Sequence, residues 1–145
     1  MQIETTEFEE LIERNEFAIA YEQTKSMTEK EIIEELEVLA YNAEHSDDTV
    51  DFLAFSFAYK YKLLINDIKW NFILMRLIET SYMYFKGMPD IVLECACRLL
   101  ELDNSHLRAL QAIVDFYEHY ISHCSDELYE KTKKRMDELG YTMTS

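Results

Sequence analysis

The stretch ACRLLELDNSHLRALQAIVDFYEHY, residues 96–120, contains two amphipathic patterns joined by a short polar turn. Apolar residues recur on both sides of the turn at spacings of three and four, as they do on one face of an α-helix. Asn104 and Ser105 are residue types that begin helices well. The stretch therefore predicts two helices joined by a short turn. The apolar stripe of the second helix is Leu107, Leu110, Ile113, Val114, Tyr117 and Ile121.

The same periodicity recurs along the whole chain, with helix starts near residues 7, 29, 48, 68, 89, 106 and 126. The 145 residues include only two glycines and one proline. An all-β protein needs many tight turns built from such residues, so the composition excludes it. Alternate helix starts lie about 40 residues apart, which is typical of stacked helical hairpins. We therefore predict a single all-α domain over residues 1–145, with about seven helices stacked as antiparallel hairpins.

Particular residues mark several of the predicted helix boundaries. Thr28 and Glu31 have the spacing of a capping box, in which each side chain bonds the backbone of the other residue. Gly87 follows an apolar helical pattern over residues 67–86 and suits a left-handed C-terminal position. The first helix is expected to run from about Thr6 to Gln23, with apolar residues on one side and glutamates on the other.

The segment 96–120 resembles the junction between two tetratricopeptide repeats. Leu100 to Asp103 match the turn that ends one repeat of that family, with Asn104 where proline is usual. Leu110, Ile113 and Tyr117 match the large, leucine and tyrosine positions of the next repeat, whereas Val114 replaces a small glycine. The resemblance covers roughly residues 68–139. It implies a protein-binding groove without catalysis; an irregular helical bundle is the alternative.

Acidic residues are concentrated in the first third of the chain. Residues 1–51 contain 16 acidic and three basic residues, a net charge of −13, whereas residues 52–145 have a net charge of −2. Such a surface repels phosphate backbones and favours encounter with a basic protein. We expect no nucleic-acid or membrane partner. The predicted partner-binding residues are Glu31, Glu34, Glu35, Glu37, Asp47, Asp48 and Asp51.

Few residue patterns suit catalysis or a cofactor. His119 and His123 have the four-residue spacing that can chelate zinc, and Cys124 follows them, but Tyr120 stands where the metalloprotease motif has glutamate. No two glycines lie close enough for a phosphate-binding loop. Cys95 and Cys97 fall on different helix faces. We therefore predict neither a catalytic site nor a metal or other cofactor.

These patterns favour a non-catalytic protein that binds another protein. Its concrete form is an acidic immunity or inhibitor protein that neutralises a basic nuclease toxin. A tetratricopeptide-like adaptor or chaperone that binds a peptide is the alternative, with Arg76, Tyr84 and Tyr117 as groove residues. The three cysteines are an odd, sparse set, and the acidic N-terminus does not resemble a signal peptide, so a cytoplasmic location is expected.

Overall fold

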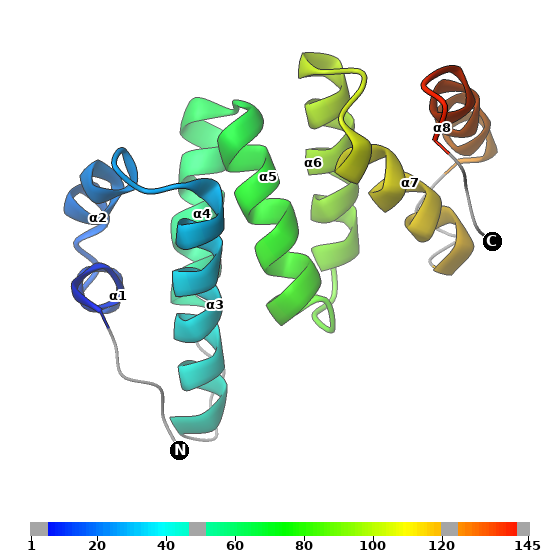
Figure 1. The fold of residues 1–145 in the computed structure, drawn as a ribbon. Coiled ribbons are helices and arrows are strands. Elements are labelled where there is room, and N and C mark those ends of the chain that lie inside the picture. Colours follow the sequence, from blue (N-terminus) through cyan, green and yellow to red (C-terminus); the bar gives the residue numbers. More distant parts are fainter. Residues whose placement is uncertain (1–5, 47–51, 120–124, 142–145) are drawn as a thin grey trace. The chain divides into compact units, whose positions relative to one another are not determined.

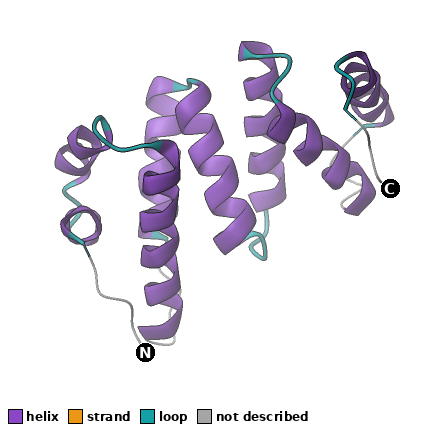
Figure 2. Ribbon diagram, in the orientation of Figure 1, coloured by secondary structure: helices purple, strands orange, loops and turns teal. Residues whose placement is uncertain are grey.

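The computed structural model describes residues 6–46, 52–119 and 125–141. Within these residues the secondary structure is helical, with eight α-helices, one π-helical segment and no strand (Figures 1 and 2). The all-α prediction is confirmed, but the helix count of seven was wrong. The prediction of stacked hairpins with a repeat remains a prediction. Within the described residues, no helix is both long enough and apolar enough to cross a membrane.

The extra helix comes from a break in the pattern predicted as one helix from Thr6 to Gln23. Helix α1 (Glu7–Glu13) and helix α2 (Phe17–Thr24) are separate. Asn15 between them has φ 61°, in the left-handed region that asparagine tolerates better than most residues. The Asn15 N–H donates to the Ile12 carbonyl and the Glu16 N–H to the Leu11 carbonyl, at 3.0 and 2.9 Å. These two bonds form a Schellman motif, which ends α1 without glycine.

The chain divides into two compact units, Met1–Met83 and Tyr84–Ser145. Helices α1 and α2 belong to the first unit, together with α3 (Glu29–Ser46), α4 (Leu53–Ile65), α5 (Ile68–Leu77) and the π-helical segment η1 (Ile78–Tyr82). Helix α1 packs on α2, α3 and α4, while α5 packs on α3 and α4. The expectation of one domain over 1–145 stays a prediction.

Aromatic rings fill the centre of the first unit. The buried ring of Phe57 on α4 lies 5.6 Å from Phe8, 5.4 Å from Phe17 and 5.9 Å from Trp70, each in an edge-to-face arrangement. Tyr61 lies 5.1 Å from Phe57 on the same helix. The rings of Phe8, Phe17 and Trp70 come from α1, α2 and α5, so the Phe57 side chain on α4 connects four helices.

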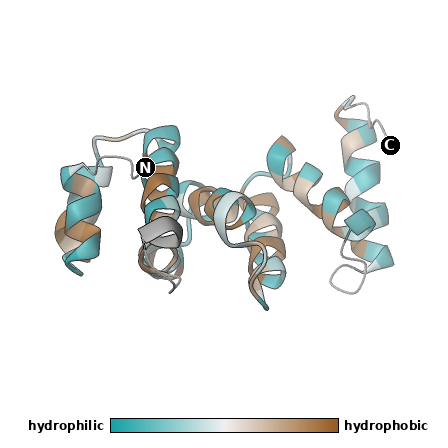
Figure 3. Cartoon of the chain, turned by 90° about the horizontal axis from the view of Figure 1, so that it is seen from below, coloured by the Kyte–Doolittle hydropathy of each residue, from teal (hydrophilic) through white to brown (hydrophobic). Residues whose placement is uncertain are grey.

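The second unit contains α6 (Met88–Leu102), α7 (Leu107–His119) and α8 (Asp126–Glu138). Helix α7 packs on both of the others. The contact between α7 and α8 contains a small apolar cluster of Leu110, Val114 and Met136. Figure 3 shows α8 as mostly hydrophilic, and only Thr132 and Met136 of this helix are buried.

Most of the predicted helix boundaries are confirmed. The Thr28 N–H donates to Glu31 Oε1 at 3.0 Å and the Glu31 N–H to Thr28 Oγ1 at 3.1 Å, which is the predicted capping box. Gly87 has φ 88°. Besides the break in the first pattern, two boundary predictions were wrong: α4 begins at Leu53 rather than near residue 48, and the helix predicted over 67–86 becomes π-helical at Ile78 and ends at Tyr82.

Candidate functional site

Carboxylates gather where α1 packs on α3. Glu9 on α1 is buried and forms a capping box with Thr6 at the start of this helix. Glu9 Oε2 accepts a hydrogen bond from the Thr6 N–H at 3.0 Å. Its other oxygen, Oε1, is buried and has no hydrogen-bond partner among the described residues. Burial raises the pKa of Glu9, and the charges of Glu35 and Glu13 raise it further against the opposing Thr6 hydrogen bonds.

Glu9, Glu13 and Glu35 therefore form a group of like charges, which we call the α1/α3 carboxylate group. Among the described residues no ion pair joins any of the three to a lysine or arginine. Like charges held together in this way disfavour ionisation of the most buried member. A basic side chain placed beside Glu13 or Glu35 would offset their effect on Glu9.

The predicted acidic residues on α3 differ in their surroundings. Glu31 is exposed, and its hydrogen bonds with Thr28 lower its pKa. Glu34 is exposed and lies 3.9 Å from Lys30. Glu37 is half-buried, and burial raises its pKa, with Arg76 opposing and Glu34 adding to the rise.

Of the four predicted acidic residues on α3, only Glu35 belongs to the α1/α3 carboxylate group. Asp47, Asp48 and Asp51 lie outside the described residues. Sequence reasoning missed Glu9 and Glu13, although their place in the first amphipathic pattern was visible.

The three residues predicted to line a peptide groove are not brought together within one unit. Arg76 belongs to the first unit and forms an ion pair with Glu79 at 3.1 Å. Tyr84 and Tyr117 belong to the second unit. Tyr84 is 96% exposed, whereas Tyr117 stacks on Tyr129 with ring centroids 3.9 Å apart.

The Tyr117 hydroxyl donates to Asp126 Oδ1 at 2.6 Å. This hydrogen bond is the main cause that raises the pKa of Tyr117. The hydrogen bond to Asp126 and the stacking on Tyr129 both connect α7 to α8, so Tyr117 contributes to packing within the second unit.

The possible metal pair cannot be assembled from the described residues. His119 ends α7, and its Nδ1 lies 3.0 Å from the Asp115 carbonyl oxygen. His123 and Cys124 lie outside the described residues. Within the part of the chain that is described, no three His, Cys, Asp or Glu side chains are grouped so that they could hold a metal ion.

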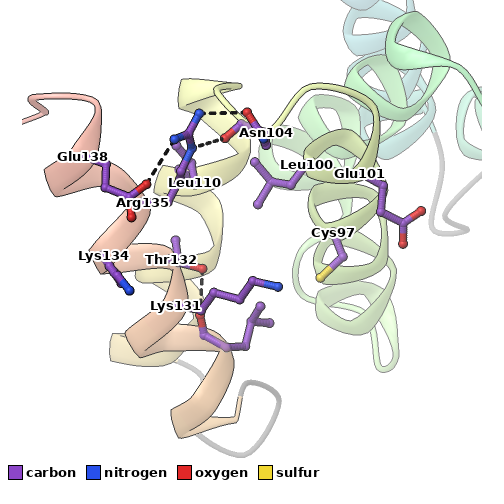
Figure 4. A pocket seen from close by; sticks show the side chains of 11 residues that line it. Cys97, Leu100, Glu101, Asn104, Leu110, Lys131, Thr132, Lys134, Arg135 and Glu138 are labelled. Carbon is purple, nitrogen blue, oxygen red and sulfur yellow. Dashed lines mark hydrogen bonds and ion pairs between the residues drawn. The ribbon is translucent and has the colours of Figure 1, made fainter.

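A second candidate site is a cavity of about 600 Å³ in the second unit, which the sequence analysis did not predict. Leu100 on α6, Leu110 on α7 and Leu128 on α8 supply apolar walls, and Cys97 lies beside Leu100. In Figure 4 the Leu100 side chain points from α6 into the gap, and Lys131 extends from α8 toward α6. Further polar lining residues are Glu101, Asn104, Thr132, Lys134, Arg135 and Glu138.

Arg135 closes one end of this cavity. Its guanidinium donates to the Asn104 carbonyl at 3.0 Å, to Asn104 Oδ1 at 2.8 Å and to Ser105 Oγ at 3.1 Å. It also pairs with Glu138 at 3.2 Å (Figure 4). A planar fork of donors suits several acceptors at once, so Arg135 fixes α8 to the turn between α6 and α7.

One signal in the sequence pointed to this region. The run Lys131-Thr132-Lys133-Lys134-Arg135 contains four of the chain's 14 basic residues within one and a half helical turns. The cavity itself could not have been read from the sequence, because it depends on how far α8 stands from α6.

Comparison of the chain with protein-family models, with curated proteins and with solved structures gave no match.

Proposed function

We propose that this chain is a non-catalytic protein that binds a basic partner protein through the carboxylates of α1 and α3. Its most concrete form is an immunity or inhibitor protein that occupies the basic substrate site of a nuclease toxin. In that role its carboxylates take the place of the phosphates that the toxin's substrate presents.

The observation that carries the proposal is the α1/α3 carboxylate group. The charges of Glu13 and Glu35 raise the pKa of the buried Glu9, and the described residues provide none of the three with an ion-pair partner. A lysine or arginine of the partner that paired with Glu13 or Glu35 would offset the repulsion that these residues exert on Glu9.

The charges around this group extend the same field. Glu7, Glu10 and Glu13 of α1 are exposed, as are Glu31 and Glu34 of α3. The basic residues of this region make exposed ion pairs: Arg14 with Glu10 at 3.9 Å and with Glu16 at 3.8 Å, Lys25 with Glu22 at 3.0 Å, and Lys30 with Glu34 at 3.9 Å. Exposed pairs contribute little, and the acidic residues outnumber the basic ones, so the surface keeps its negative potential, which speeds encounter with a positive partner.

The test is inhibition of a panel of purified basic nuclease domains by the chain, measured at rising salt. We expect inhibition of at least one nuclease, weakening steeply with salt because the contacts are electrostatic. Glu13→Lys and Glu35→Lys should each weaken inhibition by about tenfold or more. Glu118→Lys is the matched control: it makes the same charge change at an exposed residue of α7 and should leave inhibition within about twofold.

Two results count against the proposal. Inhibition that does not change with salt would remove its electrostatic basis. An equal loss with Glu118→Lys would show that only net charge matters, and that the α1/α3 carboxylate group has no particular role.

The second candidate function is the tetratricopeptide-like adaptor or chaperone that captures a peptide. The observation that favours it is Tyr84, which is 96% exposed, since tyrosine is enriched at binding surfaces. Tyr84→Ala should then abolish peptide capture while Glu35→Lys leaves it unchanged. The opposite pattern would favour the acidic surface.

A further inference from the structure

The cavity of the second unit combines an apolar interior with a cationic edge. Its volume of about 600 Å³ lies within the range of roughly 300–1,000 Å³ that is usual for ligand-binding cavities. Leu100 and Leu128 are only half-buried, so each presents apolar surface to whatever enters. An apolar side chain that entered would bury this surface along with its own.

The charges that line the cavity do not cancel one another. Glu138 is paired with Arg135, and Glu101 is paired with Arg98 at 2.9 Å. Lys131 and Lys134 remain: both are exposed, and neither has an ion-pair partner among the described residues. Both acids of the cavity thus have an arginine of their own, and two ammonium groups are left to meet a ligand.

The two lysines are three residues apart on α8, about 4.5 Å along the helix axis. Thr132 between them is buried and donates to the Leu128 carbonyl, so the backbone that carries the lysines is held in place. Carboxylates one helical turn apart on a ligand have a matching spacing. An apolar residue between those carboxylates would face the leucines.

We propose that this cavity binds an acidic amphipathic segment of another protein, with an apolar side chain between Leu100 and Leu128 and carboxylates on Lys131 and Lys134. The charge of the whole chain is −15, so general attraction cannot bring an acidic ligand to it. Only local complementarity at α8 can do so. This inference does not depend on the basic partner of α1 and α3, because it concerns the other unit and a ligand of opposite charge.

The test measures binding of a short fluorescein-labelled helical peptide with two leucines one turn apart and glutamates on either side. Fluorescence anisotropy should show saturable binding that weakens with salt. The same peptide with glutamine in place of glutamate should bind about tenfold more weakly. If the glutamine peptide binds equally well, the lysines have no role and the proposal is overturned, as it is if the acidic peptide does not bind.

Variants of α8 locate the site. Lys131→Glu and Lys134→Glu should each weaken binding by about tenfold or more, since each reverses an attraction. Lys133→Glu is the matched control on the same helix: Lys133 lies over the Tyr129 ring and does not line the cavity, so its effect should stay within about twofold. None of the three side chains is buried, and far-UV circular dichroism checks that each variant folds. Equal loss in all three variants would contradict a localised site.

A second measurement separates the cavity from the lysines. Leu100→Trp fills apolar space without changing charge, and it should weaken binding of the acidic peptide while leaving the folded helix content unchanged. The remaining alternative is that a second copy of the chain binds the cavity through the acidic residues of its first third. Sedimentation of the chain alone tests for this self-association. Self-association that Lys131→Glu abolishes would assign the cavity to that second copy and overturn the proposal of a separate partner.

Discussion

The two units of this chain are built from similar helices but differ in what holds them together and in the charge they carry. The first has an aromatic core in which Phe57 contacts rings from three other helices. The second joins α7 to α8 through a small cluster of Leu110, Val114 and Met136. Residues 1–83 have 18 acidic and seven basic residues, a net charge of −11, and residues 84–145 have 11 and seven, a net charge of −4.

This difference explains where the two candidate sites lie. The first unit packs its helices around aromatic rings and carries most of the chain's net negative charge, so its candidate site is an acidic surface. Helix α8 is mostly hydrophilic and buries few side chains, so Arg135 and its polar contacts must help to hold it. Because α8 is held partly by polar contacts to the turn between α6 and α7, it need not pack closely along α6. The cavity lies between these helices.

The largest expected effect comes from emptying the aromatic core. Phe57→Ala should lower the free energy of unfolding by about 3–5 kcal/mol, because a fully buried ring leaves a cavity among packed neighbours. Urea unfolding followed by fluorescence measures this directly in the first unit, since Trp70 is the chain's only tryptophan and is buried there.

Phe55→Ala is the control for this change. Phe55 is half-buried on the same helix and stacks on Tyr59 at 5.4 Å, so its loss should cost less. Far-UV circular dichroism follows both units in the same samples. If residues 1–145 form one domain, the two signals shift together in Phe57→Ala. A part of the circular dichroism signal that unfolds at the original urea concentration would show two domains.

Arg135→Ala should produce the next largest effect, about 1–2 kcal/mol, because four side-chain and backbone acceptors lose a charged donor. Arg135→Lys keeps the charge but not the planar fork, and should recover only part of the loss. Circular dichroism is the measurement, since the change lies in the second unit. Full recovery with lysine would mean that charge, rather than the fork, fixes α8.

The sequence was most informative where a single residue type determines local geometry. Thr28 with Glu31 marked a boundary that the structure confirms, because capping depends on neighbours in the chain. Gly87 has the predicted left-handed backbone, but it lies at the start of α6 rather than at the end of a helix. The break at Asn15 was missed because asparagine also occurs within helices. The π-helical turn at Ile78 was missed because its residues suit an α-helix equally well.

The sites were harder to predict than the helices. Charge counting found the acidic first third, but it could not distinguish Glu31, which caps a helix, from Glu35, which meets Glu9 across a helix contact. That difference depends on which faces of α1 and α3 meet. The cavity beside α8 depends in the same way on tertiary spacing, and only its run of basic residues was visible beforehand.

Loss of a helix cap should cost a similar amount in either unit. Thr28→Ala removes the Oγ1 acceptor of the Glu31 N–H, and Ser125→Ala removes the Oγ acceptor of the Leu128 N–H at 3.1 Å. Each should lower the free energy of unfolding by about 1 kcal/mol. Thr28→Ser and Ser125→Thr keep the hydroxyl and should stay close to the original protein. A markedly larger loss for Ser125→Ala would mean that α8 depends on its cap because its core contacts are few.

The smallest expected effect is a gain in the free energy of unfolding at pH 7 from Glu9→Gln, because burial makes the charged form of Glu9 unfavourable in the folded protein. Glutamine can still accept from the Thr6 N–H, but it carries no charge beside Glu13 and Glu35. Glu9→Ala is the control: it removes the charge and the cap together, so it should lack this gain. Urea unfolding followed by Trp70 fluorescence measures all three proteins.

The pH dependence gives the sign of this effect. Because burial raises the pKa of Glu9 in the folded protein, the folded state binds a proton more tightly than the unfolded chain does. Stability from this group therefore increases as pH falls through the raised folded pKa, and it is fully present below the unfolded value of 4.5. The advantage of Glu9→Gln should be greatest at neutral pH and should shrink toward pH 4.5. An advantage that stays constant over that range, or a loss at pH 7, would mean that Glu9 is not strained by its neighbours, and the α1/α3 carboxylate group would then offer a basic partner no repulsion to relieve.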